Sequence, residues 1–261
     1  MGNDLTLVQP VTADLPAAVQ SAIADIALRH KAAGGVLMRL VNAVGGKIEN
    51  RLEMLPDAVK LRIEAAVTAA LRAAYGLAEQ SHRSGDRLNS ERGHLALATL
   101  TGAVGGFGGL ATALAELPVT TAVIFRAIQS IAAGHGFDPA DPAVRAECLQ
   151  VFAAGGPLQE DDGVNTSFLA ARVTVTGPAL QRLVASISPR FAALLGQKLA
   201  AQAVPVLGAL TGAGINYAFM DYFQDMAHVR FGLMRLGQGN DPAAVAAAFR
   251  TAVAQGRIGA A

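Results

Sequence analysis

Three side chains in the C-terminal part of the chain have the types and spacing of a metal site. Asp221, Asp225 and His228 lie at positions i, i+4 and i+7, so a helix brings all three to one face. Two carboxylates and an imidazole on one face can bind a hard or borderline divalent metal ion. The sequence therefore predicts a candidate metal site, of the kind that a metal-assisted hydrolase uses. The alternative interpretation is a polar helix face on which Asp225 forms an ion pair with Arg230 or Arg235.

Glu116 and Arg126 are isolated charges in a long apolar stretch. No other Asp, Glu, Lys or Arg lies between Gly93 and Asp138. Burying an unpaired charge costs free energy, so we expect each of the two to pair with the other or with a polar group on another helix. One hypothesis is a structural ion pair between helices. The other is a polar spot in an apolar cleft that orients a ligand, or that assists a hydrolase through Glu116.

The same stretch, residues 94–139, has the composition of a helical hairpin with closely packed helices. Glycine costs about 1 kcal/mol relative to alanine inside a helix, so five glycines in one run need compensation. Gly102 and Gly106 are four residues apart, and so are Gly105 and Gly109. Small residues at this spacing let another backbone approach closely. A long run without charge can also meet lipid, so these four glycines and the two isolated charges are the candidate ligand-binding residues.

The overall composition favours helices packed through small apolar side chains. Hydrophobic residues make up 52% of the 261 residues and aromatic residues only 5%, with a mean hydropathy of +0.37. A net charge of +1 supplies no global field for nucleic acid, so no nucleic-acid partner is expected. The single cysteine, Cys148, excludes an internal disulfide and a cysteine zinc cluster. The first residues lack the basic and apolar regions of a secretory signal, so we expect a cytoplasmic protein, peripheral at the inner face of the membrane.

Turn and cap signals divide the chain into three groups of helices. Residues 12–82 are expected to form outer helices, and His82–Gly93 reads as a polar loop. The central hairpin follows over residues 94–139, with Pro118 in the first turn of its second helix, where a missing N–H costs least. Residues 141–261 are expected to form the C-terminal helices.

The sequence predicts an all-α fold in which residues 1–261 form a single domain. Asp141 and Asp241, each followed by proline, signal the starts of two C-terminal helices. The uncharged run Leu199–Met220 predicts a second Gly/Ala-rich apolar hairpin, packed on the first, with a separate amphipathic helix after it. His135 is expected to lie at a helix end as a cation that suits the helix dipole.

Three segments resemble the EcsC family. They are GGVLMRLVNAVGGKIENRLEMLP (34–56), GAVGGFGGLATALAELPVTTAVIFRAIQSIAAGHGFDP (102–139) and QAVPVLGALTGAGINYAFMDYFQDMAHVRF (202–231). The family takes its name from a protein encoded beside the two components of a bacterial ABC transporter. The resemblance therefore implies a bacterial source and a link to membrane transport. It implies no catalytic residues, because the family has no settled activity.

These observations support three hypotheses about function. The first is a non-enzymatic, membrane-proximal helical protein that binds an apolar ligand or lipid, or serves as an accessory to an ABC transporter component, without a cofactor. The second is a metal-assisted hydrolase that uses a divalent metal on Asp221, Asp225 and His228. The third is a purely structural module, whose glycines serve only helix packing.

Overall fold

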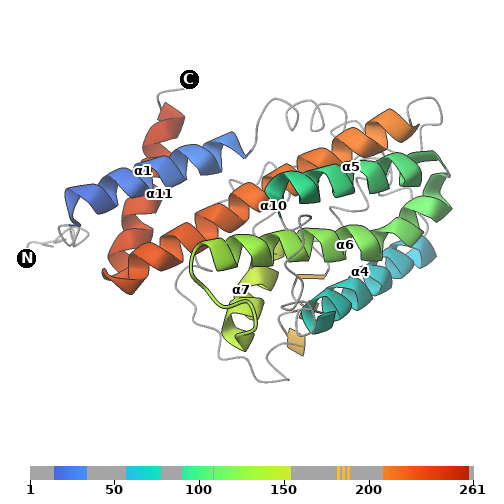
Figure 1. The fold of residues 1–261 in the computed structure, drawn as a ribbon, viewed down its shortest axis with the longest axis horizontal. Helices are drawn as coiled ribbons and strands as arrows, with labels where there is room; N and C mark the ends of the chain where they lie inside the picture. Colours follow the sequence, from blue (N-terminus) through green and yellow to red (C-terminus); the bar gives the residue numbers. More distant parts are fainter. Residues whose placement is uncertain are drawn as a thin grey trace, which may run out of the picture.

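The regular structure of the described residues is entirely helical, which confirms the predicted all-α class (Figure 1). The computed structural model describes residues 15–33, 57–77, 90–107, 109–153, 181–182, 184–185, 187–188 and 208–258. The helices are α1 (Ala17–Ala32), α4 (Asp57–Leu77), α5 (Glu91–Phe107), α6 (Gly109–Gly134), α7 (Pro142–Ala153), α10 (Gly208–Gln238) and α11 (Pro242–Ile258).

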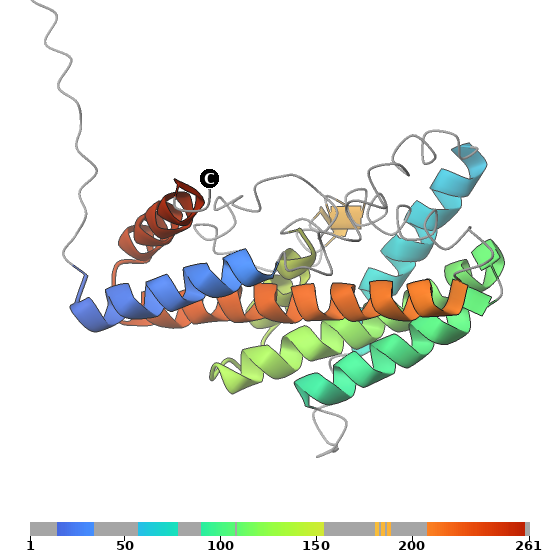
Figure 2. The same ribbon diagram turned by 90° about the horizontal axis from the view of Figure 1, so that it is seen from above.

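The longest of these helices, α10, is the element on which the others are assembled. It contains 31 residues with no internal proline, and the Asn240 side-chain amide donates to the carbonyl of Leu236 at its C-terminal end. α10 runs along the molecule, with α1 and α11 near the end where it finishes and the α5–α6 hairpin along the remainder (Figures 1 and 2). The predicted separation of Leu199–Met220 from a following amphipathic helix is wrong, because the described part of that run continues unbroken into the polar segment. Residues 199–207 lie outside the described residues.

The helical hairpin predicted over residues 94–139 is present, but its break lies elsewhere. α5 ends at Phe107 and α6 begins at Gly109, so Pro118 lies inside α6 and not in its first turn. Proline inside a helix costs about 3 kcal/mol or more. Each glycine of the preceding run also weakens helix by about 1 kcal/mol. The break therefore falls within the glycine run, while the exposed Pro118 is accommodated in a helix whose later residues are deeply buried.

Side-chain caps explain where three helices begin. The Ser90 hydroxyl accepts a hydrogen bond from the backbone N–H of Gly93 and starts α5, so the predicted loop His82–Gly93 is wrong for its last three residues. Asp141 accepts from the N–H of Ala143 at 2.8 Å, and Asp241 accepts from the N–H of Ala243 at 3.0 Å. The two Asp-Pro signals are therefore confirmed as helix starts.

The buried apolar side chains form two clusters that meet along α10. The larger cluster draws on α4, α5, α6, α7 and α10, and its centre is aromatic, with Phe125 stacked on Phe152 and Phe152 packed on Phe223. The smaller cluster joins α1 and α11 to the end of α10. The predicted packing of the second apolar run on the central hairpin is confirmed, because α10 packs against both α5 and α6. None of the described helices is both long enough and apolar enough to cross a membrane.

Candidate functional site

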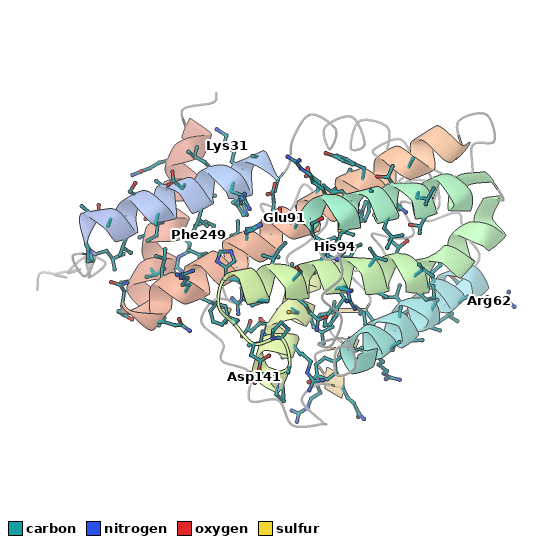
Figure 3. The ribbon with its side chains drawn as sticks, viewed as in Figure 1. Lys31, Arg62, Glu91, His94, Asp141 and Phe249 are labelled. Carbon is teal, nitrogen blue, oxygen red and sulfur yellow. The ribbon has the colours of Figure 1, made fainter. Side chains whose placement is uncertain are left out.

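Two histidines and a glutamate form a hydrogen-bonded chain across three elements, which we call the histidine cluster. His228 of α10 places its Nε2 atom 3.0 Å from Oε1 of Glu91 on α5. The other ring nitrogen of His228, Nδ1, lies 3.1 Å from Nε2 of His135, which follows α6. Figure 3 shows Glu91 at the start of α5, alongside α10. Three segments far apart in the sequence therefore contribute one polar group each.

Local structure places each member of the histidine cluster. The Ser90 cap starts α5 and puts Glu91 at the end that meets α10. His135 ends the last turn of α6, where its N–H donates to the carbonyl of Ile131 at 3.0 Å. The chain then reverses at Gly136, whose φ of 86° favours glycine. His228 lies within α10, so the cluster fixes the end of the hairpin against the long helix.

Both histidines of the cluster favour the neutral form. Burial lowers the pKa of His135, and the neighbouring His228 lowers it further. Burial also lowers the pKa of His228, followed by the charge of Arg29, against the opposing effect of Glu91. The predicted position of His135 at a helix end is confirmed, because it directly follows α6, while its lowered pKa disfavours the cation that would suit the helix dipole. Since a carboxylate only accepts, the Nε2–H of His228 donates to Glu91, and the Nδ1 lone pair of His228 faces His135.

Asp225 lies beside the histidine cluster but pairs with a different helix. Its Oδ1 atom is 3.7 Å from Nε of Arg29 on α1. The predicted ion pair with Arg230 or Arg235 is wrong, because Arg230 turns into the core. Burial raises the pKa of Asp225 to about 6. Arg29 opposes this shift, and the nearby carboxylates of Asp221 and Glu91 add to it.

We expect Asp225→Asn to stabilise the protein at neutral pH by about 1 kcal/mol. The folded-state pKa of about 6 lies above the unfolded value of about 3.9, so this carboxyl group favours folding most below pH 4. That contribution is lost as the pH rises through 6. A pKa shift of about two units corresponds to roughly 3 kcal/mol. The stability gained in Asp225→Asn is smaller, because the carboxyl group is partly exposed to solvent and the variant loses the charge that attracts Arg29. Urea unfolding at pH 4 and pH 7.5 measures the change.

The control for this prediction is Asp25→Asn, which alters an exposed carboxylate on α1. We expect it to change the free energy of unfolding equally little at both pH values. The lowered histidine pKa values have the opposite effect, because they reduce the free energy of unfolding as the pH falls below about 6.5. The wild type and the variant share these histidines, so this effect cancels in the comparison. An Asp225→Asn protein less stable than the wild type at pH 7.5 would show that the Arg29 contact dominates.

A buried ion pair lies deeper along α10. Arg230 is 2% exposed and its guanidinium contacts the carboxylate of Glu147 on α7, with Nε donating to Oε2 at 3.0 Å. Burial raises the pKa of Glu147 and lowers that of Arg230, while each partner opposes the shift of the other. The two charges therefore depend on each other, because neither has access to bulk water.

Polar side chains also hold α5 against α10. The Asn216 amide donates to the carbonyl of Ala98 at 3.0 Å, and the Gln224 amide donates to the carbonyl of Glu91, also at 3.0 Å. His94, labelled in Figure 3, is buried in the same region of α5. Burial and then the charge of Arg126 lower its pKa. Side chains of α10 thus donate hydrogen bonds to backbone carbonyls at two positions along α5, and these contacts fix the register of the two helices.

The sequence-predicted ligand residues are only partly within the described structure. Gly102 is buried in α5, and Arg126 is half-buried on α6, where its charge influences His94. The side-chain surroundings of four others lie outside the described residues, and these are Gly105, Gly106, Gly109 and Glu116. The predicted pairing of Arg126 with Glu116 therefore stays a prediction.

Between Ala96 and Leu100 the exposed side chains of α5 are apolar. Ala96, Leu97 and Leu100 are exposed there, with exposed fractions of 38% for Leu97 and 62% for Leu100. Arg92 is exposed at the start of the same helix, and no charged residue follows it in α5. A helix that is apolar on its inner and outer faces is typical of one that meets a further apolar surface. We call this set of four residues the α5 outer face.

The predicted metal residues do not converge in the described structure. Asp221 is exposed, Asp225 turns toward Arg29, and His228 turns toward Glu91 and His135. Within the described ranges, no group of three or more His, Cys, Asp or Glu side chains is arranged to hold a metal ion. The hydrolase hypothesis built on these three residues stays a prediction.

Comparison with known proteins identifies the family. The model of the EcsC protein family matches residues 38–236, which is most of the chain. The chain belongs to the EcsC protein family. The match includes every member of the histidine cluster and the α5 outer face. No curated protein and no solved structure matches this chain.

The sequence alone pointed to only one member of the histidine cluster as a site residue. It selected His228 from helical spacing and correctly placed His135 at a helix end, but it did not bring the two together, and it placed Glu91 in a loop. Their partner lies 137 and 93 residues away in the chain. The available signals were the serine that caps α5 and the glycine that follows His135, and both specify local backbone geometry only.

Proposed function

We propose that this EcsC-family protein binds a lipid surface through the α5 outer face. The observation that carries the proposal is the exposure of Leu97 and Leu100 on a helix that has no charged residue after Arg92. A helix lying in a membrane interface buries its apolar residues at the boundary between headgroups and acyl chains. Arg92 lies at the start of this face, where anionic headgroups attract a basic side chain.

The proposal leaves the inner side of α5 in its place. Ala98 and Gly102 are buried, and Asn216 and Gln224 hold the backbone of α5 on α10. Contact with lipid through the opposite side of the helix therefore needs no unfolding of the hairpin. Val119 of α6 and Tyr217 of α10 are further exposed apolar side chains on the two helices that pack against α5.

We expect Leu97→Asp/Leu100→Asp to reduce binding to vesicles at least tenfold. Fully burying a leucine contributes about 1.5–3 kcal/mol, and these two side chains are each part-exposed, so together they supply about 2 kcal/mol. A change of 1.4 kcal/mol is tenfold in affinity. Flotation of detergent-free protein with phosphatidylcholine vesicles, and with vesicles that also contain phosphatidylglycerol, measures the bound fraction.

A matched control is Leu28→Asp/Leu61→Asp, which changes two leucines on α1 and α4 that are each 66% exposed. This pair should float as the wild type does, and both double variants should keep the wild-type melting temperature. Equal loss in the two double variants would attribute binding to general hydrophobicity and contradict the assignment to α5. Absence of wild-type flotation with both vesicle types would remove the proposed function and leave a transporter component as the next partner to test.

A further inference from the structure

We propose that His135 and His228 together bind one late first-row divalent metal ion, such as Zn²⁺, Ni²⁺ or Cu²⁺. This site differs from the one predicted by helical spacing, because it joins the end of α6 to α10 and uses neither Asp221 nor Asp225. It does not depend on the proposed lipid contact, since it lies in the histidine cluster and not on the α5 outer face.

The separation of the two ring nitrogens carries the proposal. Nε2 of His135 and Nδ1 of His228 lie 3.1 Å apart. Two imidazole nitrogens that share a tetrahedral ion, with bonds of about 2.0–2.1 Å, lie about 3.3–3.4 Å apart. The pair therefore needs a displacement of only a few tenths of an ångström, with each ring turned by roughly 35° so that its lone pair meets the ion and not the other nitrogen. Imidazole is also the ligand that suits zinc, nickel and copper.

Glu91 supplies the support that metal-binding histidines commonly have. A histidine that binds through one nitrogen usually donates its other N–H to a carboxylate, which fixes its tautomer and raises its basicity. His228 makes this contact with Glu91 at 3.0 Å, so its Nδ1 already presents a lone pair toward His135. When His135 binds through Nε2, its proton moves to Nδ1, and no net charge is added to the protein.

The surroundings give the ion access to the cluster. The ring of His135 lies beside Gly232 of α10, where an added Cβ would meet Cδ1 of Ile26 at 3.1 Å and Cε1 of His135 at 3.7 Å, the latter an ordinary van der Waals contact. His228 is 22% exposed and Glu91 is 54% exposed, so water reaches the cluster. Because no group of three candidate ligands is arranged to hold a metal within the described residues, water completes the coordination, and binding is weaker than at a four-ligand structural zinc site.

The test uses the full-length chain without a histidine tag, stripped with a chelator and titrated calorimetrically with Zn²⁺ and with Cu²⁺. We expect one ion per chain and tighter binding of Cu²⁺ than of Zn²⁺. His135→Gln and His228→Gln should each weaken binding at least tenfold, and Glu91→Gln should weaken it about tenfold through loss of the supporting carboxylate. His30→Gln, on α1, is the matched histidine control and should bind as the wild type does.

Two results would overturn the proposal. One is unchanged affinity in His135→Gln, including the case in which Asp225→Asn weakens binding, which would return the site to the residues predicted by helical spacing. The other is no saturable binding to the wild type. A readout without variants guards against misfolding, because electron paramagnetic resonance of the Cu²⁺-loaded wild type should show two nitrogen ligands. Fewer than two would also contradict a histidine pair.

Discussion

Replacing Arg230 with methionine should lower the free energy of unfolding by about 3–5 kcal/mol. Arg230 is 2% exposed and Glu147 is 9% exposed, so the variant leaves a carboxylate buried without its guanidinium partner. Breaking a buried ion pair by removing one member typically costs this much, because the remaining charge keeps its desolvation penalty. Chemical unfolding of the wild type and Arg230→Met at pH 7 measures the difference.

Two further proteins separate the lost charge from lost packing. The double variant Glu147→Leu/Arg230→Met should recover most of the loss, because hydrophobic side chains of similar volume often replace a buried ion pair at little cost. Arg235→Met, five residues later on the exposed side of α10, should change stability by less than about 0.5 kcal/mol. A double variant as unstable as Arg230→Met would mean that packing, and not the unpaired charge, sets the cost.

The second large effect is expected at Ala98, where α5 and α10 approach closely. Ala98 is fully buried, and its carbonyl accepts the hydrogen bond from Asn216. Ala98→Leu adds three carbon atoms at this contact and forces the two helices apart, so we expect a loss of about 1–3 kcal/mol or more. Thermal and urea unfolding followed by circular dichroism measure it.

Ala96→Leu is the matched control, because it makes the same change two residues away on the exposed side of α5. It should leave stability near the wild-type value and strengthen vesicle binding, since it enlarges the α5 outer face. If Ala98→Leu were tolerated equally well, close packing through small residues would not hold the hairpin on α10. If Ala96→Leu failed to affect vesicle binding while Ala98→Leu unfolded the protein, the structural hypothesis would be favoured.

The helical class and several helix starts could be predicted because local chemistry determines them. Asp141 and Asp241 each accept a hydrogen bond from the backbone N–H two residues later, and the proline between donor and acceptor cannot donate one. This pattern depends on only three residues. The apolar face of α4 was also predictable, and Ile63 and Val67 are buried as its spacing required. Such features need no information about the rest of the fold.

The hairpin break was not predictable in the same way. Pro118 is the stronger local signal for a helix start, but the position of a break depends on the total free energy of both helices and their packing. The burial of α6 residues after Pro118, such as Ile124 and Phe125, stabilises the long helix and offsets the free-energy cost of a proline inside it. Only the assembled core reveals that balance.

The candidate sites were harder still, because they depend on contacts between distant segments. Asp225 was expected to pair within its own helix, yet Arg29 of α1 is its partner. The partners of the buried ion pair, Glu147 and Arg230, are 83 residues apart. The exposed side of α5 could not be distinguished from its buried side either, because both carry apolar residues.

The dependence on α10 also has a consequence for how the protein is made. Because α10 packs against both α5 and α6, the inner face of the hairpin that ends at Gly134 cannot be covered by α10 until that helix, which ends at Gln238, has been synthesised. At about 5–20 residues per second, the intervening hundred or so residues take about 5–20 s. During that interval the nascent chain displays an apolar hairpin without its cover. Chaperones that hold nascent chains should therefore bind ribosome-attached fragments that end before α10 and release those that extend beyond it.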